Sequence, residues 1–263
     1  MRQLVVIKGA GDLASGVAHR LYKAGFAVIM TEVPRPTAIR RTVAFAEAVY
    51  AGRVTVEGVT ACLAAGPEEA LDKTRKGEIA ILVDPEAKVI KALRPEIVVD
   101  AIMAKTNLGT RMDQAPIVIA LGPGFTAGRD AHAVVETKRG HYLGRVIWEG
   151  EALPNTGIPG EVAGFSEERV LRAPADGVFK GLKTIGAAVT AGETVAVVGK
   201  VPLYARIDGV LRGILHDGLE VHKGMKVGDI DPRGERDYCF TISDKARAIA
   251  GGVLEAILHL LNL

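Results

Sequence analysis

Residues 4–32 read LVVIKGAGDLASGVAHRLYKAGFAVIMTE, and their pattern predicts the architecture of the first half of the chain. The apolar run 4–8 predicts a strand buried on both faces, and residues 13–22 repeat apolar side chains at helical spacing. A second strand is expected from Ala27 to Met30. The glycines between the first strand and the helix match the pattern G-x-G-x-x-[GA]. This order of strand, glycine loop, helix and strand predicts a Rossmann-like unit.

The positions of the glycine loop have predicted roles in holding a dinucleotide. One glycine permits a tight turn, the next lets backbone N–H groups approach a pyrophosphate, and a small residue lets helix and strand pack closely. Glu32 follows about 20 residues later, where a carboxylate would accept a ribose hydroxyl. We therefore expect NAD, NADP or another nucleotide to bind Glu32 and the loop residues Gly9, Gly11, Asp12, Leu13 and Ala14. The alternative is that the glycines serve packing alone.

Three arginines follow Glu32 closely, at positions 35, 40 and 41. They could contact a 2′-phosphate and favour NADP, whereas Glu32 would repel that phosphate and favour NAD. A solvated loop and helix start is an equally acceptable interpretation of these arginines.

Further apolar runs at 79–83, 97–99 and 117–121 predict three more strands, and residues 68–76 predict a helix between strands. Alternating strands and helices indicate a doubly wound parallel sheet, whose ligands bind beyond the carboxyl ends of the strands. The residues that follow these runs are therefore expected to join the cofactor site: Asp84, Asp100, Gly122 and Gly124. A turn or cap role is the alternative for the two aspartates. Lys105 and Asn107 could add a cation and an amide to the same edge.

Residues 128–149 predict an antiparallel hairpin that turns at residues 138–140. The period of two places Asp130, His132 and Glu136 on one face of the hairpin. Carboxylate and imidazole groups suit a divalent metal or a proton transfer, so these three residues are the candidate metal ligands. The alternative is an ordinary solvent-facing side of a hairpin.

The second half of the chain contains an internal repeat with an offset of 32 residues. The offset aligns Ala173 with Ala205 and also relates the pairs Asp176/Asp208, Gly177/Gly209, Val178/Val210, Gly181/Gly213, Gly192/Gly224 and Val195/Val227. Two such copies must bury each other's apolar faces, and the pattern resembles the barrel-sandwich hybrid of lipoyl and biotinyl carrier domains. Lys200 stands between the copies without a methionine neighbour, so no covalent lipoyl or biotin group is expected.

The length of 263 residues predicts about two domains. We expect a Rossmann-like nucleotide-binding domain with a hairpin extension at 1–154, a linker at 155–168, the repeat domain at 169–235, and a C-terminal helix within 236–263. That helix should run from about Lys245 to Leu261 after a cap at Ser243 or Asp244. It must be buried, either on the first domain or against a second subunit. The second alternative would make the protein a homo-oligomer.

Composition excludes several classes of protein. A net charge of +2 offers no footprint for nucleic acid or an anionic membrane, and no apolar stretch reaches the length of a membrane span. Cys62 and Cys239 form neither a disulfide framework nor a thiolate zinc site. The chain begins with Met1 directly before a strand, without a signal peptide, so a cytoplasmic location is expected.

Several stretches together resemble the accessory proteins of the selenium-dependent molybdenum hydroxylase system. They are KGAGDLASGVAHRL (8–21), ALGPGFTAGRDAHAVVETKRGHYLGR (120–145), NTGIPG (155–160), GVLRG (209–213), GMKVGDIDPRG (224–234) and TISDKARAIAGGVLEAIL (241–258). The resemblance implies a role in maturing a molybdenum hydroxylase, with that enzyme or its cofactor-assembly proteins as partners, but it transfers no catalytic residue. The alternatives are an autonomous NAD(P)-dependent oxidoreductase and a non-catalytic scaffold with a vestigial nucleotide fold.

Overall fold

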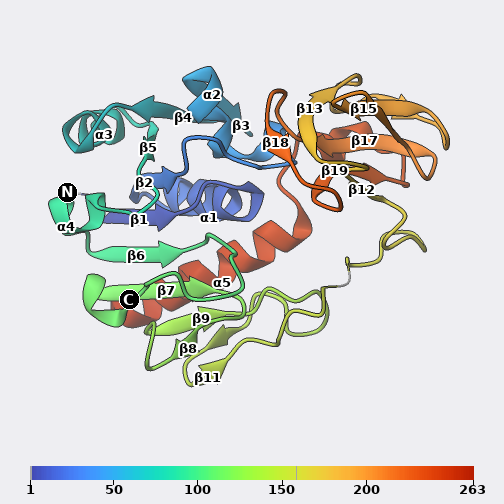
Figure 1. The fold of residues 1–263 in the computed structure, drawn as a ribbon. Helices are drawn as coiled ribbons and strands as arrows, with labels where there is room; N and C mark the ends of the chain where they lie inside the picture. The colour runs from blue at the N-terminus through green and yellow to red at the C-terminus, as the bar shows by residue number, and fades with distance from the viewer. Residues whose placement is uncertain (1, 158) are drawn as a thin grey trace. The chain divides into compact units, whose positions relative to one another are not determined.

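The structure is a computed structural model that describes residues 2–157 and 159–263 (Figure 1). It divides into two units that do not follow the order of the chain. The first unit comprises Met1–Pro36, Ala44–Thr156 and Ile242–Leu263, and the second comprises Thr37–Val43 and Gly157–Thr241. Residues 37–43 therefore belong with the second half of the chain, and the C-terminal helix belongs with the first.

The first unit is built on a mixed sheet, for which the described residues supply nine strands in the order β10-β9-β7-β6-β1-β2-β5-β4-β3. The strands from β9 to β4 in this order run parallel to one another, whereas β3 and β10 at the two edges are antiparallel to their neighbours. The strands are β1 (Leu4–Lys8), β2 (Ala27–Glu32), β3 (Arg53–Val56), β4 (Val59–Ala64), β5 (Ile79–Val83), β6 (Ile97–Asp100), β7 (Ile117–Leu121), β9 (Ala133–Val135) and β10 (Val146–Ile147). A short pair, β8 (Thr126–Ala127) and β11 (Gly150–Glu151), accompanies them.

Helices cover both faces of this sheet. On one face, α3 (Pro67–Arg75) and α4 (Val89–Leu93) pack against alternate strand residues such as Val6, Ile29 and Val98. The long helices α1 (Asp12–Lys23) and α5 (Asp244–Leu260) pack against each other, and α5 also contacts β7, β9 and β10. Because both faces are covered, the central strands are continuous apolar runs. The short helices α2 (Ala48–Ala51), η2 (Phe45–Glu47) and η3 (Met112–Gln114) lie in the connections.

The second unit consists of two four-stranded antiparallel sheets, β12-β19-β17-β14 and β16-β15-β13-β18. The 32-residue repeat recurs as three matched strand pairs. The first copy supplies β13 (Gly177–Gly181), β14 (Ala188–Val189) and β15 (Thr194–Val198), and the second supplies β17 (Gly209–Ile214), β18 (Glu220–Val221) and β19 (Lys226–Asp231). The remaining elements are β12 (Val170–Arg172), β16 (Val201–Tyr204), η1 (Arg41–Val43) and η4 (Arg236–Cys239).

The predicted fold class, a doubly wound parallel sheet followed by a barrel-sandwich hybrid and a separate helix, needs correction. The large sheet is mixed, because the two-residue turn at Glu57 and Gly58 joins β3 to β4 and so short a turn permits only antiparallel pairing. The second unit is a pair of antiparallel sheets that includes a segment from the first half of the chain. The C-terminal helix is part of the first unit.

The domain boundaries also differ from the expected ones at 154, 168 and 235. The chain passes from the first unit to the second after Thr156 and returns at Ile242, so the expected linker 155–168 falls mostly in the second unit. Ile158 lies outside the described residues. Among the residues that the structure describes, no helix is both long and apolar enough to cross a membrane.

Candidate functional site

The carboxyl ends of the central strands bring the predicted site residues to one edge of the sheet. The register pairs Lys8 with Asp100 across β1 and β6, and Glu32 with Val83 across β2 and β5. Asp84 follows β5 directly, and Gly122 follows β7. Each predicted strand-end residue therefore lies where parallel strands usually place a ligand site.

Other residues of the protein form hydrogen bonds with the glycine loop. Glu32 accepts the backbone N–H of Ala10 through Oε2 (2.9 Å) and that of Val33 through Oε1 (2.8 Å). The carbonyl of Ala10 accepts bonds from the Ser15 hydroxyl (3.1 Å) and from the Ala46 N–H (2.9 Å). Gly11 is the N-cap of α1, and Ala14 on the first turns of that helix is buried.

Two glycines at this edge are required by close backbone contacts. Gly9 has a φ of +93°, and a Cβ there would lie 3.0 Å from the carbonyl oxygen of Ala101. Gly124 has a φ of +105°, and a Cβ there would lie 2.8 Å from the Cα of Thr106. Left-handed conformations of this kind favour glycine. The loops after β1, β6 and β7 are thus packed directly on one another.

A buried ionic network lies beneath these loops. Lys8 Nζ lies 3.0 Å from Asp100 Oδ2 and also donates to the hydroxyl of Thr110. The Thr110 hydroxyl donates in turn to Asp100 Oδ2 (2.5 Å), and the Ile102 N–H donates to Asp100 Oδ1 (3.1 Å). The side chains of Lys8, Asp100 and Thr110 are buried. Asp100 is therefore held by neighbouring groups of the protein.

The candidate metal ligands do not form a metal site. Asp130 pairs with Arg129 and accepts the Thr126 N–H, His132 Nδ1 accepts the Val118 N–H (3.0 Å), and Glu136 accepts two backbone N–H groups. Within residues 2–157 and 159–263, no group of three or more His, Cys, Asp or Glu side chains is placed to hold a metal ion. Their polar atoms instead accept hydrogen bonds from the Arg129 side chain and from backbone N–H groups of β7, of β8 and of the segments that follow β9 and β11.

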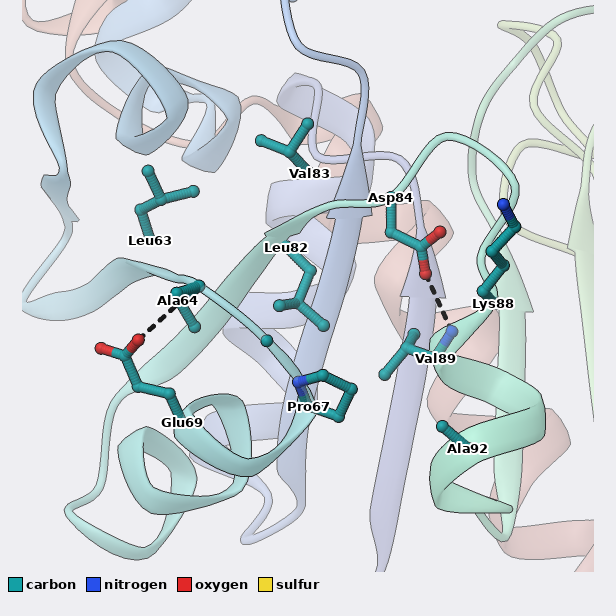
Figure 2. Close-up of a pocket in the computed structure, with 12 residues that line it drawn as sticks. Leu63, Ala64, Pro67, Glu69, Leu82, Val83, Asp84, Lys88, Val89 and Ala92 are labelled. Carbon is teal, nitrogen blue, oxygen red and sulfur yellow. Dashed lines mark hydrogen bonds between the residues drawn. The ribbon is translucent and has the colours of Figure 1, made fainter.

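A cavity of about 640 Å³ opens beyond the carboxyl ends of β4 and β5. Figure 2 shows Leu82 and Val89 beside the cavity, with Pro67 at the start of α3 and Ala92 on α4. Glu69 and Lys88 lie on its two sides. The remaining lining residues are Leu63, Ala64, Ala65, Gly66, Val83 and Asp84. Ligand pockets usually have volumes of roughly 300–1,000 Å³ and mostly apolar walls, and this cavity has both properties.

The charged groups of this cavity are partly engaged by the protein. Asp84 Oδ2 accepts the N–H of Val89, the first residue of α4 (2.8 Å). Glu69 Oε2 accepts the Ala65 N–H (2.9 Å), and Lys88 pairs with Glu86 (3.0 Å). Within the described part of the chain, no protein donor is hydrogen-bonded to the second oxygen of Asp84, Oδ1.

The sequence located only one residue of this cavity, Asp84. The start of α3 was recognisable from Gly66 and Pro67, because proline is favoured at the first position of a helix. Apolar lining residues carry no signal of their own. Lys8 was also missed, although a lysine that ends an apolar strand is a detectable sign of a buried charge.

No protein-family profile matches the chain. The chain is 56% identical over 260 residues to a protein of Escherichia coli (strain K12) described as "Uncharacterized protein YqeB". The match covers 99% of this chain but 48% of the relative, so the chain spans about half the length of the curated relative it matches.

Similar solved structures include an aspartoacylase family protein from Mesorhizobium loti, with a TM-score of 0.29, 10% identity and coverage of 87% of this chain and 84% of that one. A succinylglutamate desuccinylase/aspartoacylase from Rhodobacter sphaeroides has a TM-score of 0.28, 15% identity and coverage of 87% and 85%.

These comparisons correct the predicted family and function. The relative is described as an uncharacterized protein, and the similar structures are described as aspartoacylase and desuccinylase proteins. These descriptions do not support the predicted assignment to the accessory proteins of the selenium-dependent molybdenum hydroxylase system, so neither that assignment nor the predicted maturation role is retained. The NAD(P)-dependent oxidoreductase and the vestigial nucleotide scaffold are not retained either.

The predicted nucleotide cofactor, NAD, NADP or another nucleotide, is corrected as well. Glu32 supplies a physical reason, because the carboxylate that was expected to accept a ribose hydroxyl accepts backbone N–H groups with both of its oxygens. Arg40 and Arg41, weighed as 2′-phosphate contacts, donate to carbonyl oxygens of Tyr238, Thr241 and Ile214 in the second unit.

Proposed function

We propose that the first unit binds a small organic molecule in the cavity beyond β4 and β5. The observation that carries the proposal is the position of this cavity at the carboxyl ends of parallel strands, together with its volume of about 640 Å³. Open α/β sheets bind ligands at this edge. Asp84, which the sequence predicts as a ligand contact, also lines this cavity, and this agreement supports the proposal.

The lining indicates the chemistry of the ligand. Leu82, Val89 and Ala92 present an apolar surface, which suits a hydrocarbon or aromatic body. Asp84 offers a carboxylate oxygen, and Glu68 and Glu69 in the first turn of α3 oppose the usual preference of a helix N-terminus for anions. The expected ligand therefore carries an amine or hydroxyl donor on an apolar body, rather than a phosphate or carboxylate.

A substitution at the rim tests the site directly. Ala92→Trp places an indole in the cavity from an exposed position on α4, and Lys91→Trp adds the same group at the neighbouring exposed position outside the lining. Ligand-observed NMR would compare small aromatic amines with the matching aromatic carboxylates. We expect the amines to bind the parent protein and Lys91→Trp, and to lose binding in Ala92→Trp.

A second substitution tests the charge of Asp84 without filling the cavity. Asp84→Asn keeps an oxygen that can accept the Val89 N–H but removes the charge, so amine binding should weaken by about tenfold or more while the fold persists. Amine binding that survives in Ala92→Trp, or carboxylates that bind as well as amines, would overturn the proposal.

A further inference from the structure

A second cavity of the first unit lies beside the edge strand β10. Its volume is about 460 Å³, within the range of roughly 300–1,000 Å³ that is usual for ligand pockets. All of its lining residues come from the segment between Glu136 and Leu153. Because β10 and β4 lie toward opposite edges of the large sheet, this cavity is separate from the one beyond β4 and β5.

Two aromatic side chains of this cavity are held in place by basic groups. The ring of Trp148 packs against His259, in the last turn of α5, with 4.5 Å between the ring centroids. The guanidinium carbon of Arg145 lies 5.3 Å from the centroid of the Tyr142 ring, a cation–π contact. Trp148 is 37% exposed and Tyr142 is 50% exposed, so both rings keep surface for an apolar group of a ligand.

Glu136 shapes the cavity without offering its charge to a ligand. Its side chain is buried, Oε1 accepts the N–H of Lys138 (2.7 Å) and Oε2 accepts the N–H of Leu153 (2.8 Å). The second bond holds the backbone of Leu153, whose side chain is 44% exposed and also lines the cavity. Leu153 and Trp148 therefore supply the apolar part of the wall.

Two opposite charges in the lining are not neutralised by the protein. Within residues 2–157 and 159–263, neither the guanidinium of Arg145 nor the carboxylate of Glu149 forms a hydrogen bond or an ion pair. Glu151 differs, because its Oε1 accepts the hydroxyl of Thr126 (2.8 Å). A guanidinium binds a carboxylate through two parallel N–H bonds, and a carboxylate accepts strong hydrogen bonds from an ammonium group. The cavity therefore offers one place for each sign of charge.

We propose that this cavity binds a small zwitterion of the amino-acid or dipeptide class. Its carboxylate bonds to Arg145, its ammonium group bonds to Glu149, and its apolar side chain lies against Trp148 and Leu153. A molecule with a single charge would satisfy only one of the two charged side chains, so the pair selects for a ligand that carries both. Nothing in this assignment depends on Asp84 or on a ligand in the first cavity.

Trp148 is the single tryptophan of the sequence, so the intrinsic tryptophan fluorescence of the full chain reports on this cavity. Titrations would use L-leucine and leucyl-leucine as the two zwitterions. Each is compared with its amide, which lacks the carboxylate, and with its N-acetyl derivative, which lacks the ammonium group. We expect at least one zwitterion to change the fluorescence and to bind at least tenfold more tightly than both of its derivatives, and the better zwitterion identifies the length of the ligand.

Substitutions of the two charged residues assign each contact. Arg145→Gln should remove the preference for the zwitterion over its amide, and Glu149→Gln should remove the preference over the N-acetyl derivative. Glu86→Gln, at an exposed glutamate after β5, is the matched control and should leave binding unchanged, as should Asp84→Asn in the first cavity.

Three results would overturn the proposal. An amide that binds as tightly as its zwitterion would show a site for cations alone, and an N-acetyl derivative that does so would show a site for anions alone. The third result is that neither zwitterion binds, by tryptophan fluorescence and by ligand-observed NMR.

Discussion

Arg247 Nη2 lies 2.8 Å from Oε1 and 2.7 Å from Oε2 of Glu57, a residue that precedes it by 190 positions. Glu57 forms the turn between β3 and β4 with a φ of +44°. Its Oε1 also accepts the N–H of Ile242 (2.7 Å), just before α5 begins. One carboxylate thus attaches the returning C-terminal helix to an edge hairpin of the sheet.

The Glu57 pair predicts a specific dependence of stability on pH. Burial opposes ionisation of Glu57, but the hydrogen bonds from Ile242 and Arg247 outweigh it and hold the pKa of the carboxyl below its ordinary 4.5. A lowered folded-state pKa means that ionised Glu57 stabilises the fold above pH 4.5, and that this contribution is lost as the pH falls through the folded pKa. Because Arg247 is about half exposed, Glu57→Gln should lower the free energy of unfolding at pH 7 by about 0.5–1 kcal/mol.

Urea unfolding at pH 7 and at about pH 3.5 would check this, and the difference between parent and variant should shrink at the lower pH. Arg75→Gln is a suitable control, because its pair with Asp72 is more exposed at both side chains and should contribute less. An equal loss in Glu57→Gln at both pH values would contradict the assigned role.

The adjacent glycines of α5 predict opposite effects of the same substitution. A Cβ at Gly252 would press against the carbonyl oxygen of Gly144 and lie 2.9 Å from Val135 Cγ1, whereas nothing lies within 4 Å of a Cβ at Gly251. Gly251→Ala should therefore stabilise the protein by about 0.5–1 kcal/mol through helix propensity. Gly252→Ala should destabilise it by about 1–3 kcal/mol, because backbone must move.

Thermal unfolding of the two variants measures this difference. At roughly 2–4 °C per kcal/mol for a chain of this size, Gly251→Ala should raise the Tm by a few degrees and Gly252→Ala should lower it. A rise in both would show that α5 can move away from Gly144, and the close contact of the helix would then not contribute to stability.

Strands and helices were predictable where burial on both faces produces an unbroken pattern. The predicted strands at 79–83 and 117–121 are confirmed as β5 and β7, and the predicted Ser243 cap accepts the Ala246 N–H at the start of α5. These features depend on local composition and periodicity, which the sequence displays directly. The repeat was equally accessible, because its offset of 32 residues requires no knowledge of the fold.

Long-range placement was not predictable from the same patterns. Residues 37–43 belong to the second unit through backbone contacts with Ile214, and nothing in TAIRRTV indicates that partner. The repeat pairs Lys180 with Arg212 as conservative matches, yet Arg212 is buried and Lys180 is exposed. Of the cavity, only Asp84 was found, since apolar lining residues resemble core residues in sequence.

Lys8 and Asp100 provide the largest predicted single-site effect on stability. Both side chains are at least nine-tenths buried, and Lys8 Nζ lies 3.0 Å from Asp100 Oδ2. Lys8→Met leaves a buried carboxylate without its counter-charge, which should cost about 3–5 kcal/mol, whereas Lys8→Met with Asp100→Asn should recover much of that loss because the uncompensated charge is gone. Denaturant unfolding of both single variants and the double variant measures the coupling between the two residues.

Lys88→Met, at a pair with Glu86 that is more than two-thirds exposed on both sides, should change the free energy of unfolding by less than about 0.5 kcal/mol. Should Lys8→Met prove as mild as Lys88→Met, then Asp100 does not depend on Lys8 for its charge, and the hydrogen bonds from Thr110 and Ile102 suffice to hold it.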